Sequence, residues 1–162
     1  MNKNLTINIE NKKEEKTENQ FMQISVRDNK LKAIINVYNP ENNDAYQAVY
    51  RNEDPIHEEF MYIMHGLIFH VEQLVGAKIP NLVVEGYYRQ PSGDAELLTI
   101  YAAIRNERVC RLNFAVRVHL GAEDYPWMDR LLDDLSRCEA EALKYIYEGK
   151  RFGCEMFIQF AA

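Results

Sequence analysis

The sequence predicts an α+β domain in which a mostly antiparallel sheet carries two long helices on one face. Apolar residues recur at every second position in several segments, which is the period of strands with one buried face. Two longer segments repeat apolar residues at the spacing of an amphipathic helix. The strand segments come in runs separated by helices, an order that is typical of α+β proteins.

The composition is that of a single domain with an acidic balance. The 162 residues can bury a sizeable core, and 47% of them are apolar while 27% are charged. A formal net charge of −6 excludes a whole-protein positive field, but it leaves room for a local basic patch. No apolar run approaches the roughly 20 residues of a membrane helix, and the N-terminus lacks the apolar core of a secretory signal.

The cysteines favour a reducing compartment. Cys110, Cys138 and Cys154 lie far apart in the chain and form no CxxC pair. An odd, scattered set of this kind is typical of reduced thiols. We therefore expect a cytoplasmic protein without membrane association.

The N-terminal quarter predicts a flexible segment followed by three strands. Residues 1–20 are expected to be flexible, because 10–20 are polar and lack aromatic side chains, although residues 4–9 alternate like a short strand. Residues 21–162 are expected to form one domain. The alternation over 21–39 predicts a hairpin with Asp28-Asn29 as its tight turn, and residues 45–50 predict a third strand.

The first helix is predicted to begin at Asp54-Pro55 and to end before Gly76. Asp is a good N-cap, Pro loses no needed hydrogen bond at the first helical position, and Gly suits a left-handed stop. At about 100° per residue, His57, His65 and His70 point in three directions. We therefore expect no metal site. His57 is expected to help the helix entrance, and His70 to extend from the edge of the apolar stripe.

The side of this helix away from the apolar stripe predicts a second packing surface. Tyr62, His65, Gly66 and Phe69 gather there, and Gly66 would let another backbone approach closely at a cost of about 1 kcal/mol in helix propensity. One interpretation is a subunit interface, which implies a homo-oligomer. The alternative is an intramolecular contact, for instance with the N-terminal strands.

The second half of the chain predicts a meander, a helix and a last strand. The meander strands are residues 82–90, 95–105 and 108–120. The segment 123–149 predicts a helix with Asp124 as its N-cap, Pro126 in its first turn and Gly149 at its end. Residues 152–160 alternate like a strand.

The meander is expected to present arginine and tyrosine side chains on the face that the helices leave open. Residues such as Leu98 and Ile100 face the helices, so their neighbours face outward. Arginine and tyrosine on a sheet can bind phosphates and stack on bases, which predicts a ligand face for single-stranded nucleic acid or a nucleotide. Cross-strand pairing on a solvated sheet and a protein partner are the alternatives. The predicted ligand face comprises Tyr87, Arg89, Tyr101, Arg105, Arg111, Arg117 and His119.

Catalytic motifs give little support to an enzyme. The sequence has no GxSxG, HExxH, GxGxxG or GxxxxGK pattern. We therefore assign no catalytic residue and expect no cofactor. An enzyme of hydrolase type around His57 and Glu58 is the weakest interpretation.

Residues 53–74 and 127–152 together resemble a family of small proteins encoded by bacteriophages and prophages, whose function is unassigned. Members have a PHPDL-like helix start and a late helix that ends in a Y-x-x-EGK-x-A motif. Here the first motif departs, since the chain reads Pro55-Ile56-His57-Glu58-Glu59. The end motif is closer: Tyr145 to Lys150 follows it, with Glu148-Gly149-Lys150, but Phe152 stands in place of its alanine. The resemblance covers roughly residues 22–160 and implies a phage-derived protein in the cytoplasm of a bacterial host cell.

Two functional interpretations lead. The first is a non-enzymatic phage or prophage binding module that acts on a macromolecular partner, such as a host or phage protein, and forms a homo-oligomer. The second is a single-stranded nucleic-acid or nucleotide binder that uses the arginine and tyrosine face.

Overall fold

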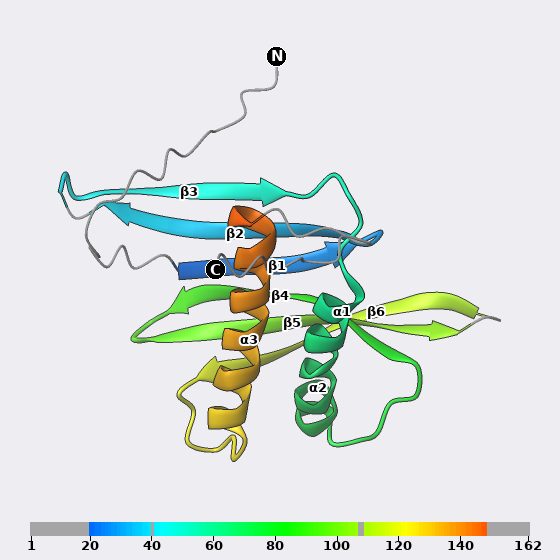
Figure 1. The fold of residues 1–162 in the computed structure, drawn as a ribbon. Helices are drawn as coiled ribbons and strands as arrows, with labels where there is room; N and C mark the ends of the chain where they lie inside the picture. The colour runs from blue at the N-terminus through cyan, green and yellow to red at the C-terminus, as the bar shows by residue number, and fades with distance from the viewer. Residues whose placement is uncertain (1–19, 40, 107–108, 149–162) are drawn as a thin grey trace, which may run out of the picture.

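The computed structural model describes residues 20–39, 41–106 and 109–148. The elements are β1 (Gln20–Arg27), β2 (Lys30–Asn39), β3 (Asp44–Arg51), α1 (Glu58–His65), α2 (Leu67–Val75), β4 (Leu82–Ser92), β5 (Ala95–Asn106), β6 (Val109–Leu120) and α3 (Met128–Tyr147). They confirm the α+β class: a six-stranded antiparallel sheet in the order β3-β2-β1-β4-β5-β6, with the helices on one face (Figure 1). The expected strands at 4–9 and 152–160 and the flexible segment up to residue 19 lie outside the described residues.

The strands β1, β2 and β3 follow one another in the sheet, and a two-residue turn joins β1 to β2. Asp28 and Asn29 occupy the β1–β2 turn with φ of 52° and 58°, the left-handed conformation that a two-residue hairpin turn requires. Asn and Asp tolerate this conformation better than most residues because their short side chains bond to the local backbone. Leu31 and Ala33 of β2 are buried on the helix side, as two-residue alternation requires.

The two halves of the sheet meet through a short pairing between β1 and β4. Only Gln23, Ile24 and Ser25 pair with β4, whereas β4–β5 and β5–β6 pair over almost their full lengths. Gly86 allows β1 and β4 to approach this closely, because a Cβ at this position would lie 2.3 Å from the Ile24 carbonyl oxygen. The pairing between β1 and β4 ends at Ser25 and Gly86, and the two strands diverge beyond it.

The first predicted helix starts later than expected and is divided in two. His57, not Asp54, is the N-cap: its Nδ1 accepts a hydrogen bond from the Glu59 amide at 3.2 Å. The expected Asp54 cap is wrong, because Asp54 lies three residues before the N-cap, but the role of His57 at the helix entrance is confirmed. Gly66 separates α1 from α2, and α2 ends at Gly76 in the left-handed conformation with φ of 79°.

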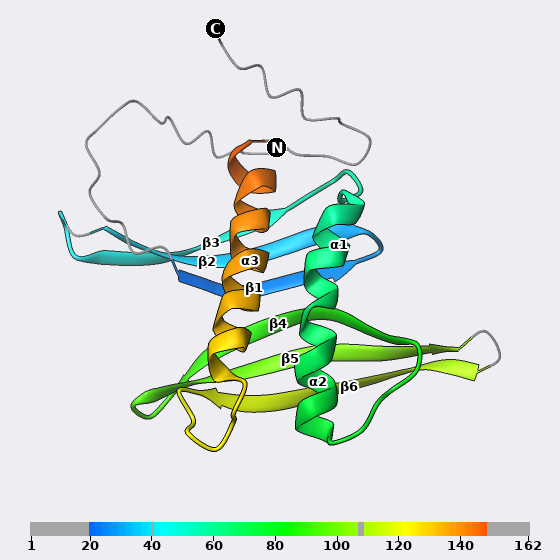
Figure 2. The same ribbon diagram turned by 60° about the horizontal axis from the view of Figure 1, so that its bottom comes forward.

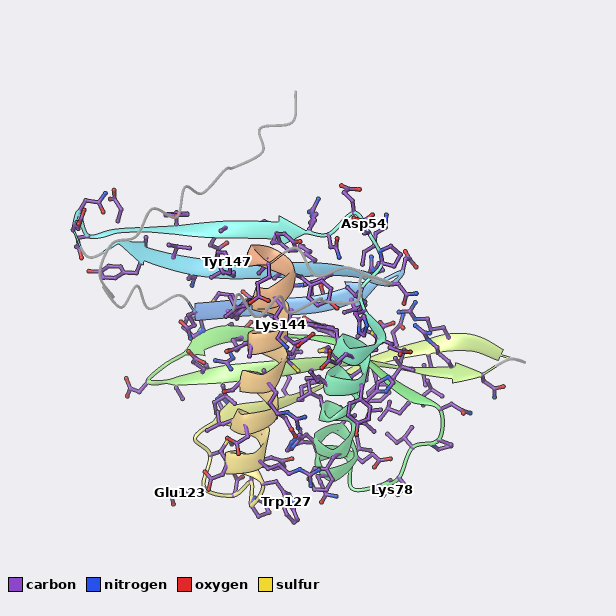
Figure 3. All side chains as sticks on the ribbon, viewed as in Figure 1. Asp54, Lys78, Glu123, Trp127, Lys144 and Tyr147 are labelled. Atoms are coloured by element: carbon purple, nitrogen blue, oxygen red, sulfur yellow. The ribbon has the colours of Figure 1, made fainter. Side chains whose placement is uncertain are left out.

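Helix α3 crosses the sheet beside α1 and α2 (Figure 2). It begins after Trp127 rather than at Asp124, and Trp127 contributes no side-chain cap. In Figure 3, Trp127 lies at one end of α3, and Tyr147 lies at the other end over the first three strands. The core fills the space between the helices and the sheet; its fully buried members include Ile24, Leu31, Phe60, Leu67, Leu98, Ile100, Leu131 and Leu135.

Tyr145 ties the end of α3 to the other elements. Its ring packs edge-on against Phe60 of α1 with centroids 5.6 Å apart. Its hydroxyl accepts the His57 amide at 2.8 Å, and its carbonyl accepts the Tyr50 hydroxyl of β3 at 2.8 Å. These contacts fix the helices over one face of the sheet, and no described helix lies on the other face (Figure 1).

Candidate functional site

The side of the sheet away from the helices is called the open face here. Strand register aligns one row of its side chains across all six strands, and the row contains both cationic and small residues. Ser25 and Gly86 have small or no side chains, so the surface is low at the centre of the row. Lys32 and Arg51 stand beside it on β2 and β3. The row comprises Arg51, Lys32, Ser25, Gly86, Tyr101 and Ala115.

A β-bulge in β4 changes which side chains reach the open face. Val84 pairs with Ala102 and Gly86 with Tyr101, so β4 has one residue more than β5 between these pairs. Glu85 therefore stays on the open face, while Tyr87 turns to the helix side. The placement of Tyr87 and Arg89 on the open face was wrong, because two-residue alternation does not continue through a bulge.

Tyr87 and Arg89 instead join the sheet to α3. Tyr87 is fully buried, and its hydroxyl donates to Glu139 Oε1 at 3.3 Å. Arg89 forms an ion pair with the same carboxylate at 2.9 Å. Burial, reinforced by the nearby Glu139 charge, raises the pKa of Tyr87 well above its usual value, and burial also raises the pKa of Glu139. These two residues are structural and cannot contact a ligand on the open face.

The remaining residues of the predicted ligand face are exposed. Tyr101 is 43% exposed at the centre of the open face, and Arg105 lies where the β5–β6 register is irregular. Arg111 pairs with Glu85, and its Nε also donates to Asn113 Oδ1 at 2.9 Å. Arg117 and His119 are exposed further along β6.

A groove of 640 Å³ crosses the open face between β1–β2 and β5–β6, and is called the basic groove here. Tyr101 and Arg111 line one side, as the meander sequence predicted, while Arg27, Lys30 and Lys32 line the other. Sequence reasoning missed these three cations because it considered the hairpin and the meander separately. The signal was present, since Lys32 alternates with the buried Leu31 and Ala33.

The cations of β1, β2 and β3 face one another across neighbouring strands. Arg27 is the register partner of Lys30, and Lys32 is the register partner of Arg51. None of these four side chains forms an ion pair among the described residues. Like charges directly opposite one another destabilise a sheet, so this arrangement holds unfavourable energy that a bound anion would relieve.

A second cleft of 390 Å³ opens where β1 and β4 diverge, and is called the split here. It shares Arg27, Glu85 and Arg111 with the basic groove and adds Arg105. Its apolar lining comes from Val26, Val83, Val84 and from Met61 of α1, which lies on the helix side of the sheet. Together, the two clefts are lined by five cationic side chains and two carboxylates.

The predicted second packing surface divides into two parts. Gly66 approaches the Asp134 side chain of α3, and Phe69 packs edge-on against Trp127 with centroids 5.2 Å apart. These two residues thus take part in an intramolecular contact. Tyr62, which is 75% exposed, and His65 are solvent-exposed in the part of the chain that the structure describes.

His70 does not extend to the surface as expected; it is fully buried between α2 and α3. Its Nδ1 lies 2.7 Å from the Tyr125 hydroxyl and its Nε2 lies 3.0 Å from Asp134 Oδ2. Burial raises the pKa of Tyr125 to about 12, which keeps that hydroxyl protonated. The phenol can therefore donate to Nδ1 while Nε2–H donates to Asp134, which suits a neutral imidazole.

No protein-family model matches the chain, and searches among curated proteins and among solved structures found no similar protein. Within the described residues, no three or more His, Cys, Asp or Glu side chains gather in a way that could hold a metal ion. None of the described helices combines the length and apolar composition needed to cross a bilayer.

Proposed function

We propose that the protein is a non-catalytic binding module whose macromolecular partner is single-stranded nucleic acid, bound in the basic groove. The observation that carries the proposal is the gathering of five cations against two carboxylates on a chain of net charge −6. Sequence-independent binding of nucleic acid depends on such local positive charge rather than on the charge of the whole protein. The resemblance to phage-encoded proteins supports a phage or prophage origin.

The groove supplies both kinds of contact that a single strand uses. Arg27, Lys30 and Lys32 form a charged wall that can follow a phosphate backbone, and release of counterions would drive that contact. Tyr101 stands exposed on the opposite side, where its ring can stack on a base. A strand bound here would also neutralise the like-charged pairs Arg27–Lys30 and Lys32–Arg51.

Fluorescence anisotropy with a labelled single-stranded oligonucleotide tests this proposal. We expect binding at low salt that weakens steeply between about 50 mM and about 200 mM salt. The double variant Arg27→Ala plus Lys32→Ala should bind at least about tenfold more weakly and lower the salt slope by about two. Arg137→Ala, on the helix-covered side of the molecule, removes a cation outside the groove and serves as the control.

The proposal fails if the intact protein does not bind the oligonucleotide at low salt. It also fails if the double variant binds as tightly as the control variant. Circular dichroism of both variants verifies that a loss of affinity does not come from unfolding.

A further inference from the structure

The split combines four apolar side chains with three arginines at a gap between two strands. Val26, Val83 and Val84 line it from the two diverging strands, and Met61 lines it from α1. Arg27, Arg105 and Arg111 come from three different strands around it. Exposed sheet surfaces are ordinarily solvated, whereas this cleft reaches between two strands toward the helix layer.

The size and lining of the split suit a small ligand with a flat body and an anionic group. Ligand pockets typically measure about 300–1,000 Å³, and the 390 Å³ of the split falls in this range. Its lining is mostly polar, with the apolar side chains Val26, Met61, Val83 and Val84 available to contact a ring. Methionine adapts its shape to a planar ring. Guanidinium groups bind phosphate through paired hydrogen bonds and also stack on bases.

We propose that the split binds one unstacked nucleobase, with the phosphate of that nucleotide held by Arg27 and Arg105. This inference rests on the proposed function, because the basic groove shares its lining with the split and would hold the neighbouring phosphates. The occupant is a nucleotide unit, which can come from a free nucleoside monophosphate or from one nucleotide of a bound strand. Glu85 and Asp28 also line the split and repel any anionic group, so contacts to the base must contribute to binding.

Calorimetric titration of the full chain with adenosine 5′-monophosphate and with ribose 5-phosphate tests whether the base matters. We expect the nucleotide to bind at least tenfold more tightly than the sugar phosphate. Val83→Phe should fill the split with the larger side chain and abolish this preference. The variant should still fold, because both Val and Phe are favoured in strands. Val83→Ala leaves the split open and should keep the preference within a factor of three.

Methyl NMR of the intact protein provides a readout that does not depend on variants. With methionine methyl groups labelled, addition of adenosine 5′-monophosphate should shift the Met61 signal, because Met61 lines the split. Met128, at the start of α3, should not shift. An unmoved Met61 signal at saturating nucleotide overturns the inference.

The outcomes separate this inference from the proposed function. If an oligonucleotide binds with steep salt dependence but the nucleotide binds no better than ribose 5-phosphate, the split does not bind a base and the basic groove still binds a strand. If neither the oligonucleotide nor the nucleotide binds at low salt, both proposals fail. Binding of the nucleotide without the oligonucleotide supports the split with a free nucleotide as its occupant and overturns the strand.

Discussion

Gly86 lies directly opposite Ser25 in the antiparallel pairing of β1 with β4, and the backbone of Ile24 and Ser25 leaves no room for a side chain on Gly86. A Cβ at this position would lie 2.6 Å from Ser25 Cα and 2.3 Å from the Ile24 carbonyl oxygen, both of them backbone atoms that cannot move alone. The close approach joins the two halves of the sheet and precedes their divergence into the split. The open face therefore depends on this short three-residue pairing between strands that are distant in sequence.

Gly86→Ala should destabilise the fold by about 2–3 kcal/mol, because the new methyl group overpacks against the backbone. Urea unfolding measures the loss of free energy. Gly93→Ala is the control: Gly93 has φ of 63° with open space around it, so only the left-handed strain of about 1–2 kcal/mol applies. Equal losses in the two variants would contradict the close approach.

Substitutions at Tyr87 and Tyr101 should have opposite effects: the first should change stability and the second should change oligonucleotide binding. Tyr87→Phe removes the hydrogen bond to Glu139 and should lower the free energy of unfolding by about 1–2 kcal/mol without changing oligonucleotide affinity. Tyr101→Ala should weaken oligonucleotide binding by about 1–3 kcal/mol, the range of one base–aromatic stack, with little effect on unfolding. Urea unfolding and anisotropy on both variants check this, and weaker binding by Tyr87→Phe would contradict the bulge placement.

Lys32→Gln should stabilise the fold while weakening nucleic-acid binding. The substitution removes repulsion from Arg51, so the free energy of unfolding should rise by about 0.5 kcal/mol at low salt and the gain should shrink as salt screens the charges. Lys144→Gln is the control, since it removes a cation that pairs with Glu141 at 2.7 Å and should not stabilise. Denaturant unfolding at two salt concentrations measures both variants. A loss of stability in Lys32→Gln would show that Lys32 has no unfavourable interaction to relieve.

The stability of the protein should fall as the pH drops below about 6.5, the ordinary pKa of histidine. Burial lowers the pKa of His70, although the hydrogen bond to Asp134 opposes the shift. The folded state therefore favours neutral His70, and this contribution is present above the unfolded pKa and is lost as the pH falls through the folded pKa. His70→Gln should lessen the fall in unfolding free energy between about pH 7 and pH 5. Exposed His65→Gln should behave like the unchanged protein.

The exposed part of the predicted packing surface should determine the oligomeric state. Tyr62 is 75% exposed, which leaves a large aromatic ring in solvent on α1. We expect a homo-oligomer in light scattering and a shift of Tyr62→Ser plus His65→Ser toward the 19.0 kDa chain. Phe69→Leu, which changes a residue packed against Trp127, should leave the oligomeric state unchanged. A mass of 19.0 kDa for the unchanged protein would contradict the expected homo-oligomer.

Local sequence patterns predicted much of the architecture. Two-residue alternation predicted the buried side of β2 and β5, because the pleat of a strand leaves few other choices once one face is buried. Asp28-Asn29 predicted its turn since few residue pairs accept positive φ angles, and Gly76 predicted the end of α2 for the same reason. His57 was expected at the helix entrance and caps the helix there.

The sequence by itself determined the class of fold, the exposure of Tyr101, Arg105, Arg111, Arg117 and His119, and the side of β2 on which Lys32 lies. Only the tertiary structure decided which side chains meet. The bulge that turns Tyr87 inward, the burial of His70 against Asp134 and the convergence of Arg27 with Arg105 all depend on contacts between one segment and another. Periodicity reports how one segment presents its side chains, whereas strand order and close approach are properties of two segments at once.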